Sequence, residues 1–194
     1  MLSALFASLV ALAPVPAAAP ADSVMWRIDA SHSEIGFKIR HFMSRVRGRF
    51  NEWSGTLVVD PARLDQGSVD ITIKTASINT ANERRDNDLR SQNFFLADSF
   101  PTITFKSKRV VANGTNMKIV GDLTIKGVTK EVILEGEMTG TIGPAAPRQR
   151  IGFSFTTVLN RTDYGIVWNR AVEGGGVMLG DDVTVEISIE AIRQ

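Results

Sequence analysis

Apolar residues recur at every second position through most of the chain after Val24. This period of two is typical of β-strands that bury one face and expose the other. In the segment 34–40, for example, Ile35, Phe37 and Ile39 alternate with charged and small residues. The same alternation is found near residues 24–29, 53–59, 69–74, 102–111, 116–126, 131–139, 150–156 and 183–190. The pattern therefore predicts about eight or nine strands.

Short turns join several of these segments. Asn113-Gly114 is suited to a two-residue type I′ turn, and Lys126-Gly127 forms a second compact turn that sets Ile125 beside Val128. Such hairpins make neighbouring strands antiparallel, and no alternation of strands with helices is found. A set of half-apolar antiparallel strands either stacks as a sandwich or closes as a barrel, and the pattern leaves both open.

One segment breaks the period of two. Thr80-Ala81-Asn82-Glu83 matches a capping box, which predicts a helix from Ala81 to about Gln92. The segment is almost entirely polar, so this helix is expected on the surface, with Asp86 and Arg90 paired across one turn. An apolar cluster that contains Phe94, Phe95, Leu96 and Phe100 follows and is suited to cover one end of a sheet or barrel.

The first 21 residues have a different character. They contain no charged side chain, and an apolar run from Leu2 to Val15 leads to the small residues Ala19-Pro20-Ala21. This is typical of a secretory signal peptide, and we expect cleavage after Ala21. Prolines interrupt the run before it reaches the roughly 20 residues that span a bilayer. Residues 22–194 are then expected to form one exported domain.

Composition excludes several functions. The 194 residues carry 22 Lys+Arg against 21 Asp+Glu, and this nearly neutral net charge is not typical of a protein that binds nucleic acid. The absence of cysteine excludes thiol nucleophiles, cysteine-ligated metals and disulfides. The two histidines, His32 and His41, lack metal-ligand spacing, and each is expected to hydrogen-bond at a strand end. We therefore expect no metal site, no cofactor and no enzymatic activity.

Several sequence motifs occur in an order that resembles the YceI-like family of exported, lipocalin-like, lipid-binding proteins. The matching segments are 29–37, 48–55, 77–80, 85–86, 91–95, 100–105, 121–130 and Arg161-Thr162-Asp163-Tyr164-Gly165-Ile166. Together they cover nearly all of the chain after the predicted signal peptide. The chain departs from the family at Asn87-Asp88-Leu89, where the family usually has a histidine before the leucine.

The resemblance implies an all-β fold, an eight-stranded antiparallel lipocalin-like β-barrel with one short helix near an end. It also implies a long apolar lumen that holds an isoprenoid or similar amphiphile, and a periplasmic location. A cytochrome-b-type membrane protein as partner and a homodimer are further implications.

Candidate ligand-binding residues follow from this fold. The inward-facing positions are expected to be Ile35, Phe37, Ile39, Leu57, Ile71, Ile73, Phe105, Leu123, Ile125, Phe153, Phe155, Val185 and Ile187. Phe94, Phe95 and Phe100 are candidates for the mouth of the barrel. His41, Arg161 and Asp163 are candidates for contact with a polar head group, although the segment around Arg161 also fits a salt bridge at the barrel end.

The expected function is that of a binding or carrier protein for a long-chain isoprenoid, such as a polyprenyl lipid or an isoprenoid quinone. One alternative is a stress-related scavenger of hydrophobic antibiotics or fatty amides that uses the same lumen. Another is a lipid-modifying enzyme that uses His41 or Asp163.

Overall fold

The fold is taken from a computed structural model, which describes residues 24–143, 148–171, 175 and 177–194. The predicted signal peptide lies outside this range. The strands are β1 (Met25–Ile28), β2 (Glu34–His41), β3 (Ser44–Phe50), β4 (Trp53–Asp60), β5 (Arg63–Lys74), β6 (Ile78–Asn79), β7 (Thr102–Asn113), β8 (Asn116–Ile125), β9 (Val128–Ile142), β10 (Arg150–Asn160) and β11 (Leu179–Arg193). The α-helix is α1 (Glu83–Arg90), and the short 3-10 helices are η1 (Ala30–His32), η2 (Thr75–Ser77) and η3 (Arg161–Tyr164).

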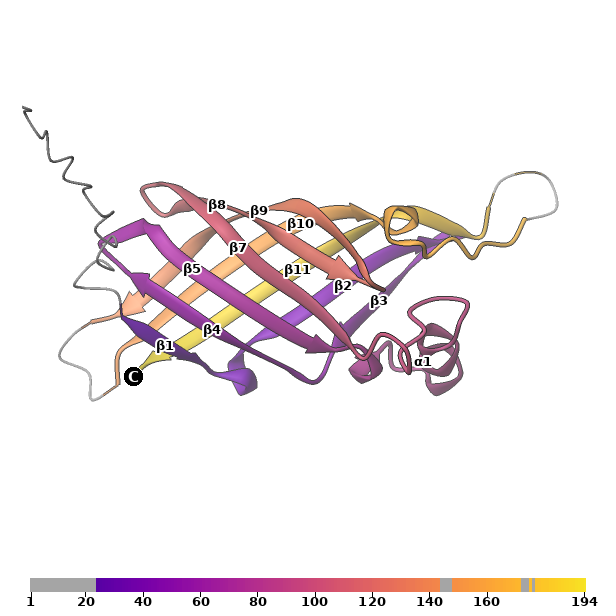
Figure 1. The fold of residues 1–194 in the computed structure, drawn as a ribbon, viewed down its shortest axis with the longest axis horizontal. Helices are drawn as coiled ribbons and strands as arrows, with labels where there is room; N and C mark the ends of the chain where they lie inside the picture. The colour runs from indigo at the N-terminus through magenta and orange to yellow at the C-terminus, as the bar shows by residue number, and fades with distance from the viewer. Residues whose placement is uncertain (1–23, 144–147, 172–174, 176) are drawn as a thin grey trace, which may run out of the picture.

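The strands close into a barrel, which confirms the fold expected from the resemblance and decides against a sandwich. Eight of them form an antiparallel ring in the order β1-β4-β5-β7-β8-β9-β10-β11, and β11 pairs with β1 again. Figure 1 shows the strands crossing the long axis of the molecule obliquely, with α1 at the end away from the C-terminus. Closure gives every strand of the ring a partner on both sides, so the main-chain edges of an open sheet are removed.

β1 and β2 behave as one long strand with an interruption. Both pair with β11, β1 through Ala191–Arg193 and β2 through residues 179–188, and η1 lies between them. At the interruption the Ser33 hydroxyl donates to the Glu190 carbonyl and accepts the Glu190 amide, replacing ladder hydrogen bonds. The Asp29–Ser33 motif therefore has a structural role at this junction.

β3 is a strand that the sequence pattern does not predict. It pairs with β2 and, at its end, with β6. Its inward positions are Val46, Gly48 and Phe50, so a glycine interrupts the apolar alternation. A Cβ on Gly48 would lie 2.3 Å from the Phe37 ring and 2.8 Å from the Thr80 methyl, which leaves no room for a side chain there.

The predicted turns form, one of them shifted by one residue. Ile125 pairs with Val128 across the Lys126-Gly127 turn, as expected. In the β7–β8 hairpin, however, Asn113 pairs with Asn116, so Gly114 and Thr115 are the central residues. Gly114 has φ 60° and occupies the first central position, where a type II′ turn favours glycine.

The helix is shorter than its predicted range, and the predicted capping box is wrong. Ala81 has φ 59°, which is incompatible with a helix, so Asn82 becomes the N-cap and accepts from the Arg85 amide. The Thr80 hydroxyl instead donates to Asp86, which is buried.

The predicted Asp86–Arg90 ion pair is also not observed. The carboxylate of Asp86 is engaged by Thr80, while the Arg90 guanidinium donates to the carbonyls of Ala76 and Ile78. The helix is thus held against the barrel by polar contacts as well as by Leu89, which packs on a core cluster.

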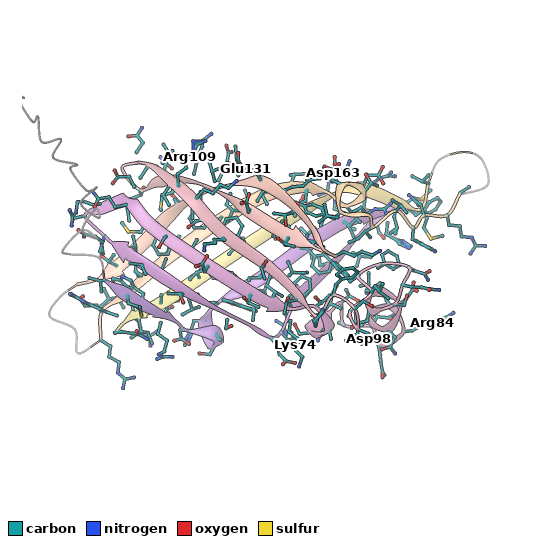
Figure 2. The ribbon with its side chains drawn as sticks, viewed as in Figure 1. Lys74, Arg84, Asp98, Arg109, Glu131 and Asp163 are labelled. Atoms are coloured by element: carbon teal, nitrogen blue, oxygen red, sulfur yellow. The ribbon has the colours of Figure 1, made fainter. Side chains whose placement is uncertain are left out.

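Charged side chains cover the outside of the barrel, as Figure 2 shows for Lys74, Arg109 and Glu131. Inside, buried apolar residues form one cluster that includes Trp26, Val59 and Phe153. A second cluster includes Phe50, Phe94 and Tyr164 and lies towards α1. No helix within the described residues is long and apolar enough to cross a membrane.

Candidate functional site: an apolar cavity in the barrel

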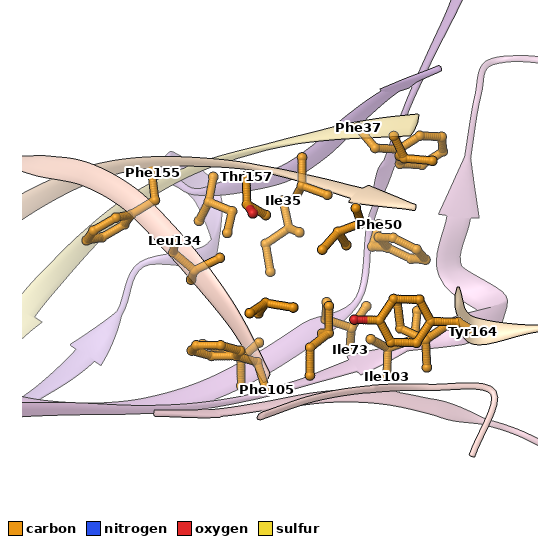
Figure 3. A pocket seen from close by; sticks show the side chains of 18 of the residues that line it. Ile35, Phe37, Phe50, Ile73, Ile103, Phe105, Leu134, Phe155, Thr157 and Tyr164 are labelled. Atoms are coloured by element: carbon orange, nitrogen blue, oxygen red, sulfur yellow. The ribbon is translucent and has the colours of Figure 1, made fainter. Parts of the chain in front are cut away.

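A cavity of about 340 Å³ runs through the barrel interior and is lined by both apolar clusters. Aliphatic and phenyl side chains from strands on all sides of the ring surround it, as Figure 3 shows for Ile35, Phe105 and Phe155. A volume of this size lies within the roughly 300–1,000 Å³ of small-molecule pockets. The side chains of the barrel therefore leave space for a ligand.

The predicted inward-facing residues reach this cavity. It is lined by Ile35, Phe37, Ile39, Leu57, Ile71, Ile73, Phe105, Leu123, Ile125, Phe153, Phe155, Val185 and Ile187, together with Phe94 and Phe95. Several of them, such as Leu57, Ile71 and Leu123, keep an intermediate exposure although they face the interior. Their accessible surface opens into the cavity, so an apolar ligand would bury it.

Phe100 is not among the lining residues. Its ring packs on the β8–β9 turn, where a Cβ on Gly127 would lie 2.9 Å from it. Its backbone carbonyl accepts from the Thr75 hydroxyl. Phe100 therefore anchors the segment between α1 and β7 and does not line the mouth of the cavity, although it was predicted to do so.

The polar part of the lining identifies the mouth. Arg85, Asp88 and Leu89 of α1 line the cavity, and His41 lines it from the end of β2. Asp88 is exposed, so the cavity reaches the surface here, at the end of the barrel where α1 lies (Figure 1). Asp88 accepts from Asn93 at 2.9 Å and stands where the family usually has histidine.

Arg161 lines the same end of the cavity and is buried, with 5% of its surface exposed. Its Nε donates to the Gly180 carbonyl at 2.9 Å, and its Nη1 donates to the carbonyls of Ile166 and Trp168 at 2.7 and 2.8 Å. Its Nη2 pairs with Asp181 at 2.9 Å. All three guanidinium nitrogens are thus used to fix the segment after η3, in agreement with the salt-bridge interpretation.

Asp163 lies outside the cavity. It is exposed on the outer surface, as Figure 2 shows, and its carboxylate is 3.6 Å from Lys130. His41 lies on the cavity wall, so the structure does not bring these two candidate polar residues together.

Two hydroxyl groups point into the cavity, and sequence reasoning did not identify them. Figure 3 shows the oxygens of Tyr164 and Thr157 directed inward. Tyr164 is 3% exposed, and burial raises the pKa of its phenol. Within the described part of the chain, neither side-chain hydroxyl has a hydrogen-bond partner. The position of Thr157, in phase with the apolar Phe153 and Phe155 of β10, is a signal that could have indicated its direction.

The other predicted histidine belongs to a separate polar cluster. His32 Nδ1 lies 3.0 Å from Asp29, which also accepts from the Ser31 hydroxyl and from Arg150. Hydrogen bonds from Ser31, His32 and Arg150 hold the pKa of the Asp29 carboxyl well below its usual range. Asp29, His32 and Glu190 could together offer ligands to a cation, but Arg150 forms ion pairs with both carboxylates. This cluster therefore ties η1 to β10 and β11.

The fold is shared with solved structures. Burkholderia cenocepacia BcnA is 21% identical and superposes with a TM-score of 0.72, with 84% of this chain and 98% of BcnA covered. The Campylobacter jejuni YCEI protein is 32% identical with a TM-score of 0.68, covering 78% of this chain and 87% of that one. A domain of Saccharophagus degradans described as polyisoprenoid binding is 14% identical, with a TM-score of 0.61 over 88% of this chain and 99% of the domain.

The sequence has relatives of closely similar length. UPF0312 protein SA2479 of Staphylococcus aureus is 43% identical over 164 residues, which cover 84% of this chain and 94% of the relative. The family model for the YceI-like domain matches residues 26–191, from β1 to near the end of β11. This match and the closed barrel agree with the resemblance found in the ordered motifs, and the chain belongs to the YceI-like family.

Proposed function

We propose that this protein binds a long-chain isoprenoid, such as a polyprenyl lipid or an isoprenoid quinone, in the barrel cavity and carries it outside the cytoplasm. The observation that carries the proposal is the apolar cavity with accessible inward-facing side chains such as Leu57, Ile71 and Leu123. Each Å² of apolar surface removed from water contributes about 25 cal/mol. A tail of isoprene units in this lumen would bury its own surface and that of the wall.

The polar atoms of the lining favour a neutral head group. The Arg161 guanidinium is fully engaged by carbonyls and Asp181, and Arg85 donates to the hydroxyl and carbonyl of Thr80. The hydroxyls of Tyr164 and Thr157 face the cavity without a partner among the described residues. A buried hydroxyl gains from a hydrogen-bond acceptor. A quinone or amide carbonyl supplies such an acceptor without an added charge.

The related proteins support this choice of ligand class. The Saccharophagus degradans domain with the same fold is described as polyisoprenoid binding. Export to the periplasm rests on the apolar segment of residues 1–21. Delivery to a cytochrome-b-type membrane protein and formation of a homodimer belong to the same proposal, because the family resemblance implies them.

Solvent extraction of the natively purified protein, followed by mass spectrometry, tests the ligand. We expect about one long-chain lipid per barrel, seen as a mass increment in native spectra. A protein that is purified empty and takes up no prenyl lipid on incubation contradicts the carrier function.

Two neighbouring residues of β9 offer a matched pair of variants. Val132 lines the cavity, whereas Ile133 faces outward and is 48% exposed. Val132→Trp places an indole in the lumen and is expected to reduce the bound lipid strongly. Ile133→Trp adds the same ring to the outer surface and should leave the stoichiometry unchanged. Equal loss in both variants would contradict binding in the lumen.

A further inference from the structure

The tip of the β2–β3 hairpin exposes two large apolar side chains. Phe42 is 47% exposed and Met43 is 90% exposed, whereas surface turns are usually formed by polar residues, glycine or proline. Phe42 also has φ 53°, a backbone region that non-glycine residues rarely adopt. Its amide donates to the Met178 carbonyl at 2.6 Å, which fixes the tip to the segment before β11.

The strands below this tip are strongly basic. Residues 38–49 contain five Lys and Arg and no Asp or Glu. Arg40 pairs directly across the ladder with Arg45, and Lys38 with Arg47. Like charges in directly opposite positions destabilise a hairpin, so these pairs are costly to the isolated fold.

Only part of this charge is compensated. Lys38 forms an ion pair with Glu186, and Arg49 with Glu34. Arg40, Arg45 and Arg47 are exposed and form no ion pair with any described residue. On β11, the residues opposite the end of β2 include Asp181, which binds Arg161, and Asp182. The hairpin therefore presents a net positive surface around an apolar tip.

The hairpin also stands at the mouth of the cavity. Ile39, His41 and Val46, which directly adjoin the tip on β2 and β3, line the cavity wall. Figure 1 shows β2 and β3 extending towards the same end of the molecule as α1. A surface bound by the tip would therefore face the opening through which a lipid enters or leaves.

We propose that the β2–β3 hairpin docks on an anionic phospholipid bilayer, with Phe42 and Met43 in the interfacial layer and Arg40, Arg45 and Arg47 on the lipid phosphates. Apolar side chains flanked by cations are the combination that binds such an interface. The docking surface is separate from the cavity. Its role in loading or unloading the lumen rests on the proposed carrier function.

Co-sedimentation of the purified protein with vesicles tests this docking. Vesicles of phosphatidylglycerol and phosphatidylcholine should bind the protein, and those of phosphatidylcholine alone should bind it much less. Met43→Ser should weaken binding roughly tenfold, because one inserted apolar side chain is lost. Arg45→Gln combined with Arg47→Gln should weaken it roughly 25-fold, since each cation near an anionic surface contributes about fivefold.

A matched control lies at the other end of the barrel. Arg109 and Val111 of β7 are also an exposed cation and an exposed apolar side chain, and Figure 2 shows Arg109 far from the hairpin. Arg109→Gln combined with Val111→Ser should leave vesicle binding unchanged. All variants keep the same N-terminal segment, so any contribution of that segment cancels.

The results separate this proposal from the carrier function. If the wild-type protein holds lipid but does not bind phosphatidylglycerol vesicles, the docking is refuted and the carrier function is unaffected. Protein that docks but is always empty refutes the carrier function alone. If the arginine variant loses binding while Met43→Ser retains it fully, charge alone holds the protein on the vesicles, the apolar tip does not insert, and the proposal is wrong.

Discussion

Replacing Arg161 by Gln should be among the most damaging single changes at the mouth of the cavity. The guanidinium donates to three carbonyls, those of Gly180, Ile166 and Trp168, and binds one carboxylate, that of Asp181. Ile166 is buried, while Gly180 and Trp168 are half-buried. Removing the side chain leaves these acceptors without their donor.

The magnitude follows from these acceptors. A hydrogen bond from a charged donor contributes about 1.5–3 kcal/mol, and we assign this value to the buried Ile166 carbonyl. Water can reach the two half-buried carbonyls, so each contributes about 1 kcal/mol. The expected loss for Arg161→Gln is therefore about 3.5–5 kcal/mol, which corresponds to roughly 7–20 °C in Tm for a domain of this size.

The ion pair contributes little to this value. Asp181 has 53% of its side chain exposed, and a salt bridge in that setting is worth about 0–1 kcal/mol. Asp181→Asn is therefore expected to cost less than about 1 kcal/mol. Arg161→Lys should lie between the two, because an ammonium group has three donors on one nitrogen and cannot reach all the acceptors that the wider guanidinium spans.

Urea unfolding of the three variants, with lipid retention measured in parallel, provides the assay. Arg161→Gln should also release lipid, since Ile166 and Trp168 line the cavity. A loss below about 1 kcal/mol for Arg161→Gln would refute the assignment of the carbonyl hydrogen bonds. An equal loss for Asp181→Asn would show that the ion pair is the dominant contribution instead.

Four further predictions concern Tyr164 in the lumen, a glycine of the barrel wall and the loss of stability at acid pH. Tyr164→Phe should weaken binding of a prenyl quinone about fivefold but not that of a prenyl hydrocarbon, because one hydrogen bond of about 1 kcal/mol is lost; an equal effect on both ligands would indicate packing alone. Since Tyr164 is the sole tyrosine, its ultraviolet absorbance should titrate above pH 10 in the folded protein and near pH 10 in denaturant. Gly136→Ala should destabilise the barrel by about 3 kcal/mol, because the new Cβ would lie 1.9 Å from the Ser154 carbonyl. At Gly143 a new Cβ would meet no atom of the described residues within 4 Å, so Gly143→Ala should be neutral in thermal unfolding. The hydrogen bonds to Asp29 lower the pKa of its carboxyl in the folded protein. Below about pH 4 the carboxyl is protonated in the unfolded chain but still charged in the folded one. The stability that the charged Asp29 contributes is therefore lost progressively as the pH falls further. Asp29→Asn should flatten the dependence of Tm on pH between about 5 and 2.

The alternation along the strands is sufficient to identify many of the apolar side chains that face the interior. Positions such as Ile35, Phe153 and Ile187 were predicted inward and line the cavity. This succeeds because a strand has a period of two, so the burial of one face fixes the direction of every side chain. The hairpin at Lys126-Gly127 was predictable for a similar reason, since its turn residues act locally.

Other features depended on contacts between distant segments. The choice between a sandwich and a barrel depends on the pairing of β1 with β11, which are far apart in the sequence. The sequence pattern does not predict β3, because Gly48 stands at an inward position where an apolar residue would be expected. Phe37 and Thr80 fill the space there. The helix began later than its capping motif indicated, because the backbone of Ala81 turns to φ 59°.

The sequence by itself determined where apolar and polar positions alternate, and so where strands form, and which family the ordered motifs resemble. Tertiary structure alone decided that Arg161 is a structural anchor, that Asp163 lies outside the lumen and that the hydroxyls of Tyr164 and Thr157 point into it. The physical reason is that alternation sets the direction of a side chain locally, whereas its partners come from strands far away in the chain. Whether the interior of a barrel is filled or open depends on how those side chains meet, and here they leave a cavity of about 340 Å³.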